Sequence, residues 1–135
     1  MALITWSEDF SVGVDVLDAD HVVIISLMNH VDDAKLAECD ERAVGRLVST
    51  LVDYACMHFE REEALMDRHG YPRLEGHREA HRVVEDQLRE LHEAYQRTAD
   101  PNISQEIMEL LNYWLVEHIL KVDMHYKPYL SPART

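Results

Sequence analysis

Five histidines and two carboxylates stand at positions where a helix packed in a bundle normally carries leucine or valine. They are His21, His58, Glu62, His77, His81, His118 and Asp123. A buried charged or imidazole group without a partner costs several kcal/mol, roughly, so a set of this size on apolar faces requires a common partner. Because imidazoles and carboxylates are metal ligands, these residues predict a metal centre.

The composition limits the classes of protein to which the chain can belong. The 135 residues are 47% hydrophobic with four Gly and four Pro, which favours one domain (1–135) of long elements over a turn-rich β fold. A formal net charge of −13 argues against nucleic acid or an anionic membrane as a partner. Without a membrane-spanning stretch or a signal-like start, we expect a cytoplasmic protein in which Cys39 and Cys56 are free thiols.

Sparse Gly and Pro residues divide the chain into four long segments, three of which begin at an Asp or Asn that can cap a helix. The expected helices run from Asp18 or Asp20 to about Glu38, from Asp40 to about Arg68, from about Leu74 to Thr98, and from Asn102 to about Val122. An extended N-terminal arm (1–17) precedes them and a C-terminal tail (124–135) follows. Because short connections make neighbours antiparallel, we predict an all-α fold, an up-down-up-down four-helix bundle.

The spacing of apolar residues places the candidate ligands in the core. In residues 74–95 apolar side chains recur at intervals of three and four, and His77 and His81 occupy the same stripe. His58 and Glu62 lie in the stripe of the second helix, and the first and fourth helices also contribute ligands. These positions are near the starts of the first and third helices and near the ends of the second and fourth. In an up-down bundle those four ends coincide, so one shared site is possible.

The spacing within each helix decides whether the ligands can converge. The second and third helices each carry an i, i+4 pair, whose members are about 40° apart around the helix and can face one point. His118 and Asp123 are spaced i, i+5, which is about 140° on an ideal α-helix. They can share a centre only if the helix end loosens, for example by a π-type turn.

The number and type of ligands narrow the choice of metal. Seven ligands exceed the four of a closed zinc site, no cysteine is among them, and the motif HExxH is absent. Mixed imidazole and carboxylate donors suit iron, manganese or copper, and a carboxylate can bridge two ions. The Glu-x-x-His motifs of ferritin-like di-iron bundles are also absent.

Four segments resemble the signature motifs of bacterial haemerythrins, and together they cover the chain from about residue 6 to 130. They are Trp6 to His21 with its Phe-Ser-Val-Gly-Val run, His58-Phe-Glu-Arg-Glu62, Gly70-Tyr-Pro72 with His77 and His81, and Trp114 to Asp123. Two departures are visible. Asp20 stands where Gln or Glu is common in that family, which could alter the hydrogen bonding around His21, and His30 stands where an aliphatic residue is usual. We expect neither residue to touch a ligand.

The resemblance implies two iron ions (Fe2+/Fe3+), bridged by carboxylates and by an oxo or hydroxo group. It assigns His77, His81 and His118 to one iron, His21 and His58 to the other, and Glu62 and Asp123 to the bridge. The iron with two histidines would keep an open position where O2 binds. The implied O2 pocket consists of Phe59, Trp114, Leu115 and Ile119, although ordinary core packing would give the same sequence pattern.

We therefore expect a non-enzymatic protein that binds O2 reversibly for oxygen carriage, storage or local delivery. The alternatives are a redox enzyme (oxidase or peroxidase) or an oxygen or iron sensor that uses the same centre. A catalytic centre would want a polar acid near the open iron, whereas Phe59 and Leu115 favour a dry pocket. A purely structural metal bundle is a third alternative, and it predicts a centre closed to small ligands.

Overall fold

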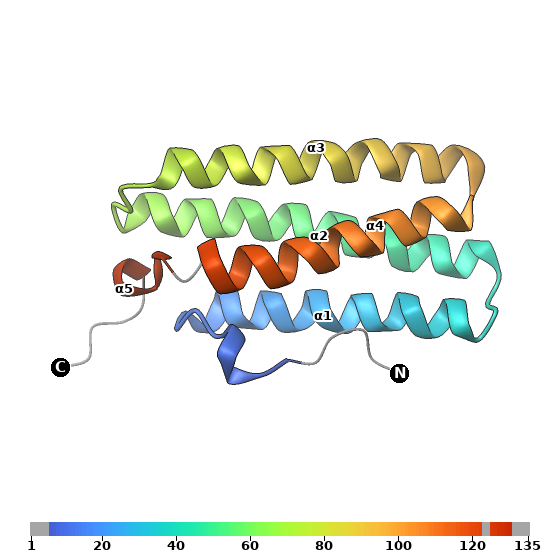
Figure 1. Cartoon of the computed structure of the whole chain (residues 1–135), viewed down its shortest axis with the longest axis horizontal. Helices are drawn as coiled ribbons and strands as arrows, with labels where there is room; N and C mark the ends of the chain where they lie inside the picture. Colours follow the sequence, from blue (N-terminus) through green and yellow to red (C-terminus); the bar gives the residue numbers. More distant parts are fainter. Residues whose placement is uncertain (1–5, 123–124, 131–135) are drawn as a thin grey trace.

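Four long helices lie side by side and antiparallel in the structure, a computed structural model that describes residues 6–122 and 125–130, without the side chains of 119–122 (Figure 1). The elements are η1 (Glu8–Phe10), α1 (Asp15–Leu36), α2 (Glu41–Arg68), α3 (Leu74–Thr98), α4 (Pro101–Tyr113), η2 (Trp114–Val122) and α5 (Lys127–Leu130). Contacts join α1 to α2, α2 to α3, and α3 to α4. The described residues contain no strand, and the predicted up-down-up-down bundle is confirmed.

The helix starts test the predicted caps. At α2 the prediction is confirmed, because the Asp40 carboxylate accepts a hydrogen bond from the backbone N–H of Ala43 at 2.9 Å. At α4 the prediction is wrong, because Asp100 is the cap and accepts from the N–H of Asn102 at 2.9 Å. Pro101 explains the shift, since its fixed φ and missing N–H suit the first position of a helix.

The N-terminal arm is shorter than predicted. Helix α1 begins at Asp15 and has no side-chain cap, so neither Asp18 nor Asp20 starts the helix, and the arm itself contains η1. Asp18 instead fastens the arm to the helix, accepting from the Ser11 hydroxyl at 2.6 Å and from the Val12 N–H at 2.8 Å. A carboxylate occupied in this way is not available to cap the helix.

The C-terminal segment is packed rather than a plain tail. After α2, Gly70 takes a positive φ of 67°, a conformation that Gly often adopts just past a helix C-terminus. The expected tail (124–135) contains α5, which contacts α2. Tyr126 and Leu130 are buried there at 0% and 5% exposure. Apolar residues four positions apart can face one side of a helical turn, and this pair closes one end of the core.

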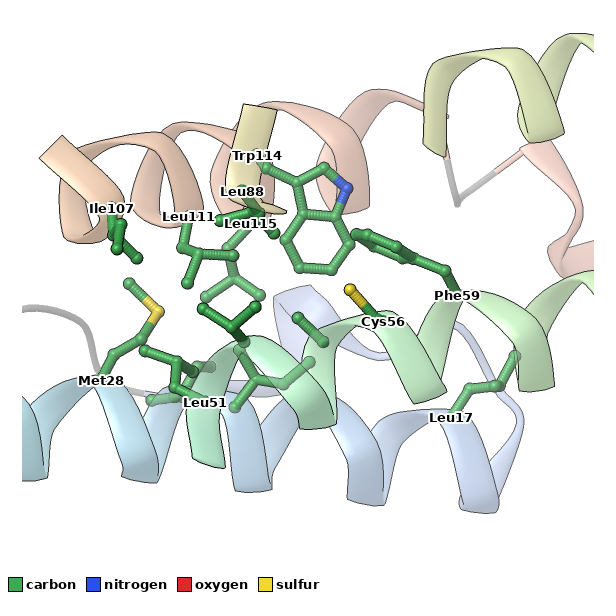
Figure 2. Packing of buried hydrophobic residues seen from close by; sticks show 14 of the residues in the cluster. Leu17, Met28, Leu51, Cys56, Phe59, Leu88, Ile107, Leu111, Trp114 and Leu115 are labelled. Carbon is green, nitrogen blue, oxygen red and sulfur yellow. The ribbon is translucent and has the colours of Figure 1, made fainter. Parts of the chain in front are cut away.

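The apolar core fills the bundle between the helices (Figure 2). Cys56 lies in this core, and burial raises the pKa of its thiol to about 12. Cys39 is exposed and the two thiols are not joined, as predicted. Within the described ranges, none of the helices has the length and apolar character needed to cross a lipid bilayer.

Candidate metal centre

The structure brings six of the seven predicted ligands together at one end of the bundle. The start of α1, the end of α2, the start of α3 and η2 all lie at the left in Figure 1. These six residues are His21, His58, Glu62, His77, His81 and His118, and all of them are buried. Asp123, the seventh, lies outside the described residues. The other four histidines, His30, His69, His92 and His125, are exposed or only partly buried, as expected.

All five buried imidazoles point their Nε2 atoms toward a common centre. The Nε2 atoms of His21 and His58 are 3.0 Å apart, and those of His77 and His118 are 3.2 Å apart. His81 Nε2 lies 2.9 Å from a carboxylate oxygen of Glu62. Imidazoles bind metal ions through such a nitrogen when it carries a lone pair, so this convergence is a ligand arrangement.

Glu62 divides the imidazoles into two sets. Its Oε1 lies 2.8 Å from His77 Nε2 and 2.9 Å from His81 Nε2. Its Oε2 lies 3.4 Å from His58 Nε2. One carboxylate therefore presents one oxygen to each set, which is the geometry that a bridging ligand requires.

The ligand atoms form two groups that share Glu62. One group consists of Glu62, His77, His81 and His118, and the other consists of His21, His58 and Glu62. Within each group the candidate ligand atoms lie within 4.8 Å of one another. Two ions held by one common carboxylate fit this pattern better than a single ion does, because one ion would leave part of the set unused.

The electrostatics of the cluster depend on contacts between the glutamate and the imidazoles. Burial alone would raise the pKa of Glu62, but hydrogen bonds with His58, His77 and His81 outweigh burial and hold the pKa well below its ordinary value. Burial would lower the pKa of His81, yet its contacts with Glu62 and Glu63 raise it. The imidazole contacts therefore favour the ionised form of this carboxylate.

The segment that carries His118 has the loosened helical form that His118 and Asp123 would need in order to share a centre. Residues Trp114–Val122 form a nine-residue π-helix, η2, which continues α4 directly. In a π-helix the backbone bonds run from residue i to i+5, so the helix turns less per residue than an α-helix does. Long π segments are rare and often occur at functional sites.

Two of the apolar residues expected around the O2 site, Phe59 and Trp114, lie beside the imidazoles. The Phe59 ring stacks on His81 with centroids 4.4 Å apart, and the Trp114 indole lies 5.0 Å from Phe59 and 5.8 Å from His118. Leu115 is fully buried, and Figure 2 shows it with Trp114 and Phe59 in the core. The fourth residue, Ile119, has its side chain outside the described set.

The donor set tests whether a metal fits. The Nε2 atoms of His21 and His118 lie against the Nε2 atoms of His58 and His77, at 3.0 and 3.2 Å. In each of these contacts at least one nitrogen must present a lone pair, because two N–H groups cannot share one contact. A cation would use such lone pairs, so these residues fit a metal ion.

The sequence interpretation missed Tyr126 and Glu63 as contacts of the cluster, and it related Asp20 to His21, whereas Asp20 contacts His58. Tyr126 donates a hydrogen bond to Glu62 Oε2 at 2.9 Å, and Asp20 and Glu63 contact the outer nitrogens of His58 and His81. The sequence pointed to Asp20, because it differs from the family pattern and precedes a candidate ligand. For Tyr126 the sequence offered only an aromatic residue in the expected tail, and for Glu63 it offered no indication.

The Tyr126→Phe substitution should destabilise the metal-free protein by about 1–3 kcal/mol, because it removes a donor to a buried carboxylate. Tyr126 is fully buried, so water cannot easily replace the hydroxyl. Urea unfolding followed by circular dichroism measures the change. The matched control is Tyr129→Phe, at a residue that is 48% exposed, where we expect a change within about 0.5 kcal/mol. Equal effects of the two substitutions would contradict the role of the hydroxyl.

The fold and the site define a helical bundle with a buried histidine and glutamate cluster suited to two metal ions. Comparison with known families agrees, since residues 12–130 match the description "Hemerythrin HHE cation binding domain". The chain belongs to the haemerythrin family.

Individual relatives match over most of their length. A "Bacteriohemerythrin" of Stenotrophomonas maltophilia is 36% identical over 126 residues, which are 93% of this chain and 80% of that protein. A "Bacteriohemerythrin" of Methylococcus capsulatus is 31% identical over 132 residues, covering 97% and 99% of the two chains. A crystal structure of wild-type haemerythrin has a TM-score of 0.88 at 30% identity, and the match covers 97% of this chain and 100% of that one.

Proposed function

We propose that this chain binds O2 reversibly at a di-iron centre, for oxygen carriage, storage or local delivery. The proposed iron ligands are His21, His58, Glu62, His77, His81, His118 and Asp123. The observation that carries the proposal is the position of Glu62, whose two oxygens face separate sets of histidines. Three histidines lie on one side and two on the other, so the second ion would have fewer protein ligands and room for a small molecule.

The surroundings of the cluster favour a carrier over an enzyme. Iron supplies reversible redox chemistry with O2, and mixed imidazole and carboxylate ligands suit it. Phe59, Trp114 and Leu115 are buried, and Phe59 and Trp114 lie against imidazoles of the cluster. Apolar walls of this kind disfavour the release of charged products. We propose no catalytic residue, and we propose Phe59, Trp114, Leu115 and Ile119 as the lining of the O2 site.

A surface groove gives a small apolar molecule a place to approach. The groove has a volume of about 480 Å³, lies between α3 and the α4–η2 helix, and is lined by Val83, Val84 and Leu110 among others. Trp114 and His118 also line it, so it borders the cluster. O2 is apolar and partitions into such surfaces more readily than ions do.

The setting proposed for this activity follows from the sequence. We propose that residues 1–135 form one haemerythrin-like domain and that it acts in the cytoplasm, where Cys39 and Cys56 would stay reduced. The strongly negative net charge of −13 supports a partner other than nucleic acid or an anionic membrane.

Anaerobic reconstitution with ferrous salt tests the proposal. We expect about two irons per chain, and exposure to air should produce a visible ligand-to-metal charge-transfer band that disappears again under argon. Metal-free protein and zinc-loaded protein are the controls, and neither should change colour. Irreversible oxidation at the first contact with air would exclude carriage. Peroxide turnover well above both controls would favour the alternative, a redox enzyme that uses the same centre.

A further inference from the structure

Two of the five central imidazoles have a second carboxylate at the nitrogen that faces away from the cluster. His58 Nδ1 lies 3.0 Å from Asp20 Oδ2, and His81 Nδ1 lies 2.7 Å from Glu63 Oε2. The Nε2 atoms of the same rings face Glu62 at 3.4 and 2.9 Å. Each ring is therefore held between an inner and an outer carboxylate.

The outer contact decides which nitrogen of the ring can bind a metal. An ionised carboxylate only accepts hydrogen bonds, so the Nδ1 atom that meets it must carry the proton. The neutral ring then has its lone pair on Nε2, directed at the cluster. The hydrogen bond also fixes the rotation of the ring and makes Nε2 more basic, which strengthens a bond to a cation.

Asp20 is held rigidly in this position. It is 1% exposed, and its Oδ1 accepts from the Tyr54 hydroxyl at 2.8 Å and from Arg61 Nη1 at 2.9 Å, which leaves Oδ2 for His58. The Arg61 guanidinium forms an ion pair with this carboxylate, and both of its oxygens are occupied, so Asp20 has little freedom to move.

Glu63 holds His81 more loosely. Its side chain is 24% exposed, and its second oxygen, Oε1, lies 3.5 Å from Arg78 Nε. Water can reach this carboxylate and can replace part of its hydrogen bonding. Glu62 and Glu63 are adjacent on α2, so one helical segment contacts both nitrogens of the His81 ring.

The geometry points to Asp20 and Glu63 as positioning residues, one for each half of the metal centre. We propose that Asp20 sets the affinity of the half formed by His21 and His58, and that Glu63 sets the affinity of the half that contains His81. This inference rests on the proposed metal centre. Asp20 is buried and held by Tyr54 and Arg61, whereas Glu63 is partly exposed. We therefore expect Asp20 to have the larger effect on metal affinity.

Anaerobic Co2+ titration of the metal-free protein tests these roles, with 1H NMR to identify which half is filled. The exchangeable Nδ1–H protons of imidazoles bound to paramagnetic Co2+ are strongly shifted, so the two halves are expected to give two and three such signals. The variants are Asp20→Asn, which keeps an acceptor without the charge, Asp20→Ala, which removes both, and Glu63→Gln. Glu60→Gln, at an exposed carboxylate of the same helix, is the matched control.

Loss of an outer carboxylate should weaken metal binding by about 10- to 100-fold at one half only. We expect about 100-fold for Asp20→Ala and about 10-fold for Asp20→Asn, with loss of the two-signal set. Glu63→Gln should cost about 10-fold or less and affect the three-signal set. The graded response of Asn and Ala separates positioning from folding, and Asp20→Asn keeps the test usable if the alanine variant does not fold.

Three results would overturn the inference. Wild-type affinities at both halves in Asp20→Asn and Glu63→Gln would show that the outer carboxylates do not position the rings. Equal loss at both halves, together with a lower melting temperature of the metal-free protein, would assign them a structural role only. A wild-type chain that fails to bind two Co2+ ions would overturn the proposed centre itself, and this result is distinguishable from the other two.

Discussion

The Glu62→Ala variant is expected to lose both metal ions at concentrations that saturate the wild type. Glu62 belongs to both groups of candidate ligands, with Oε1 facing His77 and His81 and Oε2 facing His58. Removing the carboxylate would take a ligand from each of the two proposed ions, and also the negative charge that would offset two cations in a buried site. The affinity at each position should fall by more than about 100-fold, beyond the range typical of outer contacts.

Metal analysis after gel filtration measures this loss, and circular dichroism checks that the helices remain. The matched control is Glu60→Ala, since Glu60 lies on the same helix but is exposed. We expect that control to keep two ions per chain. If Glu62→Ala and Glu60→Ala retain equal amounts of iron while both stay folded, Glu62 is not a ligand.

The helices and most of the site were accessible from the sequence because one periodicity controls both. The three- and four-residue spacing that puts Leu88 and Tyr95 into the core also puts His77 and His81 there, so the buried face of α3 could be predicted. The up-down order then fixes which ends meet. Even the π segment around His118 had a local signal, since its spacing did not suit an α-helix.

The features that could not be predicted depend on contacts between distant residues. Asp18 is of a residue type that often caps helices, but in the folded protein its carboxylate bonds to Ser11 and Val12 of the arm. Tyr126 reaches Glu62 across 64 residues, and the α5 packing that places it has no repeating pattern in the sequence. Side-chain contacts of this kind follow from the tertiary fold and not from local propensity.

Chelation of the iron-loaded protein with EDTA under anaerobic conditions should lower its melting temperature by about 10 °C or more at pH 8. A ligand at about 1,000 times its dissociation constant stabilises the folded state by about 4 kcal/mol. For a chain of this size 1 kcal/mol corresponds to roughly 3 °C. Differential scanning calorimetry of loaded and chelated samples gives the difference directly.

The difference in melting temperature between loaded and chelated protein should increase as the pH rises. On folding, the pKa of Glu62 falls below its ordinary 4.5, so its contribution to the metal-free protein is present above that pH and is lost in acid. The pKa of His81 rises above its ordinary 6.5, so its contribution is full below pH 6.5 and is lost as the pH rises through the raised value. These two groups make the metal-free cluster most stable between pH 4.5 and 6.5.

Metal binding has the opposite dependence, because ligand imidazoles must be neutral. Above pH 6.5 the metal-free protein loses the His81 contribution while the metal binds more tightly, and the two effects add. The difference in melting temperature should therefore be small near pH 5.5 and largest near pH 8. Glu62→Ala is the control, since it should show no difference between treated and untreated samples at either pH. If the difference in melting temperature between loaded and chelated wild type stays constant from pH 5.5 to 8, the buried imidazoles do not hold the metal.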